Sequence, residues 1–257
     1  EKLMNHTIPS WGTYHTEISK LLRTDCLYVT VSQDAQGIFE LSRLNPNILI
    51  LSSGGNGHIP IPLLKSVLPY VPYPKTMSAF KYIVGFHGTN RKSKRGVSQM
   101  VMPALKMALD RALVRCKFGA SEQWQQDMAN TKYNLCPRGF GRTSYRLAET
   151  IQIGRIPVYL YDNHDGDVPW IPYQGTNISI EHFGFIRSVT EINDLAGWIV
   201  YWNRNEEDII QRLERIKQVR EHYTYDGVLK QIHLFFSDPL GSHGGQLRCV
   251  TVPKTDT

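Results

Sequence analysis

The sequence has few cysteines and no long apolar segment. Its four cysteines are scattered over 257 residues, without the short spacings that bind zinc. So few cysteines in so long a chain argue against a disulfide framework, and we expect four free thiols, as in a reducing compartment. No apolar run approaches the roughly 20 residues that a membrane-spanning helix needs. We therefore expect no membrane span in this chain.

Low-complexity tracts, internal repeats and an aromatic-rich RNA-binding signature are also missing. With 41% hydrophobic and 20% charged residues, the composition is that of a folded globular protein. The net charge of +6 favours an anionic ligand, such as a phosphorylated small molecule. One compact basic run, from Arg91 to Arg95, is typical of a solvated loop, so we expect no nucleic-acid partner.

Apolar, β-branched runs alternate along the chain with segments of helical periodicity. We predict strands at Cys26–Val31, Asn47–Leu51, Phe80–Phe86, Tyr133–Cys136 and Ile156–Tyr161. We predict helices at Ser10–Arg23, from Pro103 through Cys116, from an N-cap at Ser121 through Met128, at Thr143–Ile153, and from Asn205 through Val219. This alternation predicts a parallel α/β sheet.

A proline-rich segment follows the second predicted strand. Five prolines fall within fifteen residues, from Pro60 to Pro74. Such a density is typical of a linker between domains. We therefore predict two domains, residues 1–75 and residues 76–257, with the final helices able to pack back on the first.

The stretch from Tyr133 to Asp162 carries the chemistry. It predicts a strand, a glycine-rich turn, a helix and a second strand. Gly139 and Gly141 would let backbone N–H groups approach a ligand closely, and the N-terminus of the following helix is an anion site. The turn and helix also carry three arginines, at positions 138, 142 and 146. This cluster of positive charge suits a diphosphate.

Two other interpretations stay open on the residues alone. The pattern Gly139-x-Gly141-x-x-Ser144 is close to a dinucleotide fingerprint, although its third glycine is missing. Asp162 could then bind a ribose, which predicts an NAD(P)-dependent oxidoreductase. Alternatively the turn is a plain connection in which Arg146 and Glu149, three apart on one helix, form a salt bridge. A non-catalytic carbohydrate- or nucleic-acid-binding module is a further alternative function.

The same stretch resembles the signature of the exostosin-like glycosyltransferases. Members of that family carry a CPRG–S–RL–E–G–PV pattern at this spacing. The matching residues are Cys136–Gly139, Ser144, Arg146, Leu147, Glu149, Gly154, Pro157 and Val158. Weaker, collinear similarity lies at Asp25–Gly37, His58–Pro62 and Phe86–Gly88. The resemblance spans about Thr24–Pro172, and the N-terminal part is shorter than in typical members.

The resemblance implies the GT-B arrangement, in which two Rossmann-like domains face each other across a cleft. Residues 1–75 would form the acceptor side and residues 76–257 would bind the nucleotide-sugar. The family transfers a sugar from a UDP-sugar to an oligosaccharide or glycan with inversion, and without a metal or other cofactor. Family donors include UDP-glucuronate, UDP-galactose and UDP-pentoses, of which we favour UDP-xylose.

Roles for individual residues follow from the same resemblance. Glu149 would bind the ribose hydroxyls of the donor. The diphosphate would lie near Arg138, Ser144 and Arg146, beside the backbone of Gly139–Gly141, with Arg91 and Arg95 adding charge from the next loop. These residue types suit that role, because a departing UDP gains negative charge that guanidinium and N–H groups stabilise.

An inverting transfer also needs a general base from across the cleft. Asp34, at a predicted strand end, is the first candidate and His58 the second; Gln33-Asp34 stands where the family has His-Asp. The loop motif Asp165-Gly166-Asp167 imitates a metal-binding DxD pair, but we expect no metal there.

The expected location rests on the same family. The short form resembles soluble algal or large-virus members, which favours the cytoplasm, or the host cytoplasm for a viral protein. The chain begins at Glu1, and a removed N-terminal anchor would instead indicate the Golgi lumen.

Overall fold

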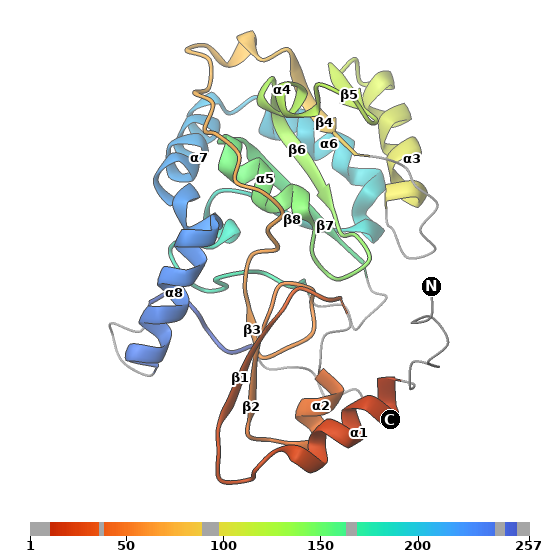
Figure 1. The fold of residues 1–257 in the computed structure, drawn as a ribbon. Helices are drawn as coiled ribbons and strands as arrows, with labels where there is room; N and C mark the ends of the chain where they lie inside the picture. The colour runs from red at the N-terminus through yellow and green to blue at the C-terminus, as the bar shows by residue number, and fades with distance from the viewer. Residues whose placement is uncertain (1–10, 36–38, 89–97, 163–168, 240–244, 251–257) are drawn as a thin grey trace.

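Two parallel β-sheets form the framework of the computed structural model, which describes residues 11–35, 39–88, 98–162, 169–239 and 245–250 (Figure 1). The small sheet has the order β1-β2-β3, with β1 Tyr28–Ser32, β2 Ile48–Ser52 and β3 Ile59–Pro60. The large sheet has the order β5-β4-β6-β7-β8, with β4 Tyr82–Phe86, β5 Cys116–Phe118, β6 Thr131–Pro137, β7 Ile156–Tyr161 and β8 Phe185–Ser188. Every strand pair is parallel, which confirms the predicted α/β class.

Helices connect and cover these strands. The α-helices are α1 Trp11–Leu21, α2 Phe39–Leu44, α3 Ser98–Arg111, α4 Trp124–Ala129, α5 Tyr145–Ile153, α6 Ile192–Trp202, α7 Glu206–Val219 and α8 Tyr225–Ser237. Short 3₁₀ helices lie at η1 Met77–Ala79, η3 Ile180–His182, η4 Val189–Glu191 and η5 Arg220–Tyr223. The predicted strands and helices are therefore present, whereas β3, β5, β8, α2, α6 and α8 had no counterpart in the sequence analysis.

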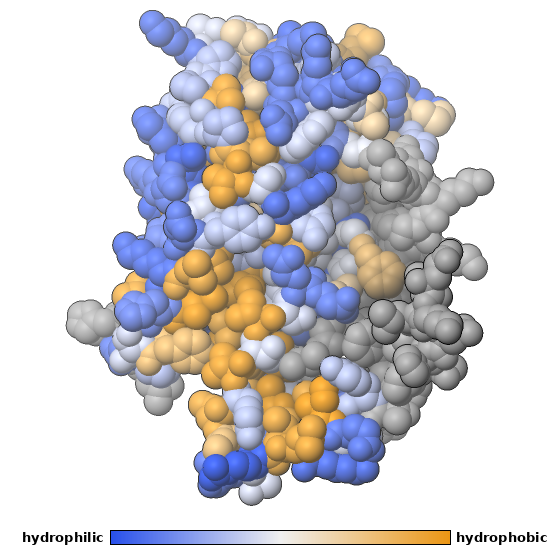
Figure 2. Space-filling model, viewed as in Figure 1, coloured by the Kyte–Doolittle hydropathy of each residue, from blue (hydrophilic) through white to orange (hydrophobic). Residues whose placement is uncertain are grey.

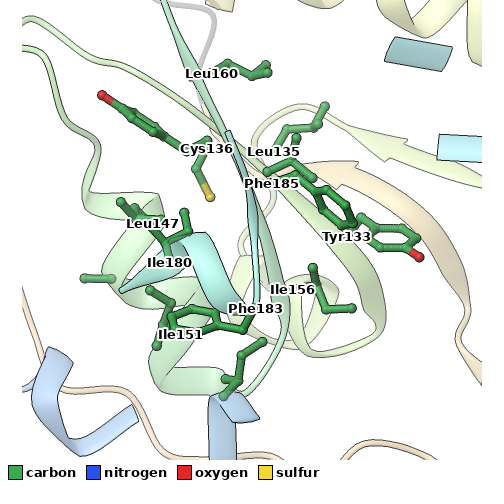
Figure 3. Packing of buried hydrophobic residues seen from close by; sticks show 14 of the residues in the cluster. Tyr133, Leu135, Cys136, Leu147, Ile151, Ile156, Leu160, Ile180, Phe183 and Phe185 are labelled. Carbon is green, nitrogen blue, oxygen red and sulfur yellow. The ribbon is translucent and has the colours of Figure 1, made fainter. Parts of the chain in front are cut away.

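Local signals explain why α5 begins and ends where it does. The Ser144 side chain caps its N-terminus by accepting a hydrogen bond from the Arg146 backbone N–H at 3.2 Å. Gly154 ends the helix in the left-handed conformation, with a φ of 88°. Between them Leu147 and Ile151 face the sheet, and Figure 3 shows these two side chains packed with Cys136 and Ile180. This buried helix leads directly to the cleft described below.

Three local predictions are corrected. The helix expected to start at Pro103 begins at Ser98, with Pro103 inside it, and ends at Arg111. It ends there because Leu113 adopts a positive φ of 55°, and Cys116 already belongs to β5. The short helix α4 has its N-cap at Gln123.

Ser121 is not the N-cap of α4, since its hydroxyl accepts a hydrogen bond from the N–H of Gln123 itself.

The strand β1, expected to be buried, is the edge of its sheet, and Val29 and Val31 are 44% and 56% exposed. Figure 2, in the same view as Figure 1, shows apolar side chains gathered in the lower part of the molecule, where the small sheet and α8 lie.

The proline-rich segment crosses from one sheet to the other along α5 (Figure 1). Buried Arg155 holds it by donating hydrogen bonds to the carbonyl oxygens of Val71 and Pro72, at 2.8 and 3.3 Å. The backbone N–H of Leu68 donates to Gln152 Oε1 on α5 at 2.9 Å. The segment is therefore hydrogen-bonded to the large-sheet part of the molecule at several points.

The chain also returns to the small sheet after α8. The backbone N–H of Val250 donates to the carbonyl oxygen of His58 at 2.8 Å. Gln246 N–H donates to Gln231 Oε1 on α8 at 2.7 Å, which positions this return. The segment after α8 is thus hydrogen-bonded to the small sheet beside β3.

The loops at the carboxyl ends of the two sheets are joined by hydrogen bonds. Three successive carbonyl oxygens, from the last residue of β2 into the following loop, each accept one bond from the large-sheet part. The pairs are Ser52 O with Trp170 Nε1 at 2.9 Å, Ser53 O with Thr143 Oγ1 at 2.5 Å, and Gly54 O with Arg142 N at 3.0 Å. The turn after β6 therefore rests directly on the loop after β2.

Glycine is required where these two loops touch. A Cβ at Gly141 would lie 2.1 Å from the carbonyl oxygen of Gly54, and one at Gly54 would lie 2.0 Å from that of Asp34. By contrast, a Cβ at Gly139 would meet the Thr143 carbonyl oxygen at 3.7 Å, an ordinary contact. The close approach at Gly141 therefore explains one glycine of the turn by packing between the two sheets.

We expect Gly141→Ala to destabilise the protein by about 1–3 kcal/mol, because the added methyl group meets backbone and not a movable side chain. Gly139→Ala is the matched control, and its effect should stay within roughly 0.5 kcal/mol. Thermal unfolding of both variants measures the difference. Equal melting temperatures for the two would show that the contact with Gly54 is not a tight one.

Candidate functional site

A cleft of about 480 Å³ lies between the carboxyl ends of the two sheets. From the small-sheet side it is lined by Gln33, Asp34, Ala35, Gly54, Leu63 and Lys65. From the large-sheet side it is lined by Phe86, Gly88, Pro137–Gly141, Thr143–Arg146 and Glu149. Ligands of open α/β sheets bind at this end of the strands, so the position is that of a binding site.

The N-terminus of α5 opens into this cleft. Ser144 and Tyr145, at its first turn, both line the cavity. The helix has no acidic residue in its first turn, so its partial positive charge is not offset there. This end of α5 is therefore suited to bind an anion.

Glu149 and Arg146 form an ion pair in the wall of the cleft. The Glu149 side chain is 5% exposed and accepts a hydrogen bond from Arg146 Nη1. The Arg146 guanidinium lies over the Trp124 ring, 4.3 Å from its centroid.

Burial raises the pKa of Glu149 above its ordinary value, and the positive charges of Arg146 and Lys65 act in the opposite direction. The salt bridge expected under the plain-turn interpretation is present, and both partners face the cavity.

Arg138 forms a second ion pair, with Asp162. Its Nε and Nη2 atoms donate to the two carboxylate oxygens of Asp162 at 2.5 and 2.7 Å. Its Nη1 donates to the carbonyl oxygens of Gly139 and Phe140, at 3.3 and 3.4 Å. The buried guanidinium thus organises the turn after β6, and Asp162 is bound to it. This pairing argues against Asp162 as the ribose ligand of a dinucleotide site.

The backbone of the turn is also partly committed. Gly139 N–H donates to the Thr143 carbonyl oxygen at 2.9 Å, so it is hydrogen-bonded within the turn. Gly141 packs against Gly54, as described above. The Gly139 N–H is therefore already hydrogen-bonded within the turn, and packing accounts for the glycine at position 141, although both residues line the cleft.

The two candidate bases lie in different places. Asp34 follows β1, is exposed, and lines the cleft on the side opposite α5. His58 does not line the cleft. Its ring Nδ1 accepts a hydrogen bond from the backbone N–H of Ile50 at 3.0 Å. Its backbone N–H donates a hydrogen bond to the carbonyl oxygen of Ile50 at 2.9 Å. His58 therefore extends the pairing between β2 and β3, and it lies outside the residues that line the cleft.

Solved structures of other proteins share this arrangement. HepE of Anabaena in complex with UDP matches with a TM-score of 0.52 and 13% identity, over 89% of this chain and 68% of HepE. TarM matches with a TM-score of 0.51 and 12% identity, over 88% of this chain and 45% of TarM. Both are GT-B glycosyltransferases. The chain has the GT-B fold.

The expected pair of Rossmann-like units facing across a cleft is thereby confirmed. No family model and no curated protein matches the sequence, so the exostosin-like family stays a prediction. The chain spans less than half of TarM and about two thirds of HepE.

Some predicted features fall outside the described residues. Arg91, Arg95 and the motif Asp165-Gly166-Asp167 are among them. Within the ranges that the structure describes, no three His, Cys, Asp or Glu side chains are grouped as a metal site, and no helix could cross a membrane. Cys26, Cys116, Cys136 and Cys249 are free thiols.

The GT-B cleft also contains residues that the sequence analysis did not select. Phe140 and Tyr145 line it with 57% and 42% exposure, and Lys65 reaches it from the proline-rich segment. Phe140 and Tyr145 are neighbours of the signature residues in the sequence, and this proximity could have identified them as cleft residues. Trp124 and Lys65 had no such signal, because their proximity to Arg146 and Glu149 arises only on folding.

Proposed function

We propose that this protein is a glycosyltransferase that moves a sugar from a UDP-sugar to an oligosaccharide or glycan acceptor. The observation that carries the proposal is the buried Glu149 carboxylate beside Arg146 and the α5 N-terminus, in a cleft between two facing sheets. A fixed acceptor for hydroxyl groups and an anion site thus lie side by side. HepE, which shares the fold, was solved with UDP and with UDP-glucose.

In the proposed donor complex, the Glu149 carboxylate accepts hydrogen bonds from the ribose hydroxyls. The diphosphate lies at the N-terminus of α5, near Ser144 and Arg146. As the bond to the sugar breaks, negative charge grows on the departing UDP. Preorganised N–H and guanidinium groups stabilise that charge, and the transfer needs no metal in this proposal.

The acceptor enters from the small-sheet side, where Asp34 follows β1. Asp34 acts as the general base that takes the proton of the attacking hydroxyl group. Attack from the face opposite UDP inverts the configuration of the transferred sugar. The exposed rings of Phe140 and Tyr145 offer surfaces for sugar rings. Among donors, UDP-xylose remains our choice.

UDP should stabilise the protein in the presence of EDTA. At 100 times its dissociation constant, a ligand adds about 2.7 kcal/mol to the free energy of unfolding. For a chain of this size, the melting temperature should rise by roughly 5–10 °C. A thermal-shift panel with UDP, several UDP-sugars, NAD and NADP measures the effect. Stabilisation by NAD without stabilisation by UDP would favour the oxidoreductase instead.

Glu149→Ala should weaken UDP binding by about tenfold or more, because a charged acceptor for the ribose hydroxyls is lost. Wild-type protein should bind 2′-deoxy-UDP more weakly than UDP, and the variant should discriminate less between the two nucleotides. Isothermal titration calorimetry measures both affinities, with Glu122→Ala as a control on an exposed glutamate outside the cleft. Unchanged discrimination in the Glu149 variant would disprove the ribose assignment.

Asp34→Asn should abolish sugar transfer while leaving UDP affinity unchanged, because the amide cannot accept the proton of the acceptor. A general base contributes on the order of 10²–10⁴ in rate. Product formation from radiolabelled UDP-sugar, measured beside UDP affinity, separates the two effects. Wild-type turnover in this variant would remove Asp34 as the base.

A further inference from the structure

Lys65 differs from the other cations of the cleft. Among the described residues that line the cavity, three carry a positive charge: Lys65, Arg138 and Arg146. Arg138 is paired with Asp162, and Arg146 is paired with Glu149. Lys65 is exposed, and within the part of the chain that the structure describes it forms no ion pair. Its ammonium group is thus the lining cation whose charge is not already matched by a described carboxylate.

The backbone on both sides of Lys65 is anchored. Leu64 is buried, and its carbonyl oxygen accepts a hydrogen bond from Gln33 Nε2, after β1, at 3.4 Å. Leu68 is also buried, and its N–H donates to Gln152 Oε1 on α5 at 2.9 Å. The backbone of the short exposed span between these two residues is therefore held in place, whereas the Lys65 side chain can change its rotamer.

The Lys65 ammonium also lies within electrostatic reach of the proposed donor site. Its charge acts on the Glu149 carboxylate and opposes the rise in the pKa of that group. Lys65, Glu149 and Ser144, the N-cap of α5, all line the same cavity. A nucleotide with its ribose against Glu149 and its diphosphate at the N-terminus of α5 would therefore share the cavity with the Lys65 ammonium group.

We propose that Lys65 binds the diphosphate of the nucleotide-sugar, from the proline-rich segment that lies along α5. This inference rests on the proposed function and adds a residue to it. An ammonium group is a compact point charge on a flexible stem, so it can follow a phosphate oxygen as the leaving group departs. Because Lys65 lies on the segment that joins the two sheets, the donor would contact both that segment and α5.

The test compares UDP with uridine, since the two differ only in the diphosphate. Lys65→Gln should weaken UDP binding by about tenfold or more, the usual size of a lost hydrogen bond to a charged group. Uridine affinity should not change, which also shows that the variant is folded. Lys65→Arg should keep most of the UDP affinity. Lys75→Gln, an exposed lysine of the same segment outside the cleft, is the control.

Isothermal titration calorimetry in EDTA gives all of these affinities. Wild-type affinity of the Lys65→Gln variant for UDP would overturn the role of Lys65 and leave the proposed function standing. Equal losses for UDP and uridine would also overturn it, since the residue would then act on the nucleoside site. If the wild-type protein bound neither ligand, the proposed function would fail and the role of Lys65 with it.

Discussion

The structure depends on the contact between the loop after β2 and the turn after β6. Three successive carbonyl oxygens, from Ser52 to Gly54, each accept a hydrogen bond from the large-sheet part of the chain. Gly141 lies against this loop so closely that a side chain would meet the Gly54 backbone. Because both loops lie at carboxyl ends of strands, the contact faces the two sheets toward each other and leaves the cleft beside it.

Charge in the cleft is arranged by two ion pairs with different consequences. Arg138 is buried and bound by Asp162 and two carbonyl oxygens, so its main effect is to hold the shape of the turn. Arg146 is less buried and stacks on Trp124, while it keeps Glu149 oriented toward the cavity. Burying a charged carboxylate without such a partner would cost free energy, so its pKa would rise and it would keep its proton to a higher pH. The ion pair and a role in ligand binding are therefore compatible for Glu149.

The sequence was most informative where structure is determined locally. The helix predicted at Thr143–Ile153 ends where α5 ends, before Gly154, and the apolar run at residues 156–161 predicted β7 with its observed bounds. It was least informative for short strands such as β3 and β5, whose two or three residues carry no periodicity. The sequence did not place His58 beside β2, because a histidine after a glycine-rich turn has the same local pattern whether it faces a cleft or bonds to a neighbouring strand.

The sequence by itself determined the class of fold and the turn-to-helix segment that lines the cleft, because alternating periodicities and the turn-to-helix pattern are properties of neighbouring residues. The tertiary structure alone decided which side chains meet. Thr143 and Ser53 are 90 residues apart, Trp170 and Ser52 are 118 apart, and Lys65 lines the same cleft as Glu149 from a segment that the sequence predicted as a linker. Such partners are selected by the packing of whole sheets, and packing leaves no periodic trace in either segment.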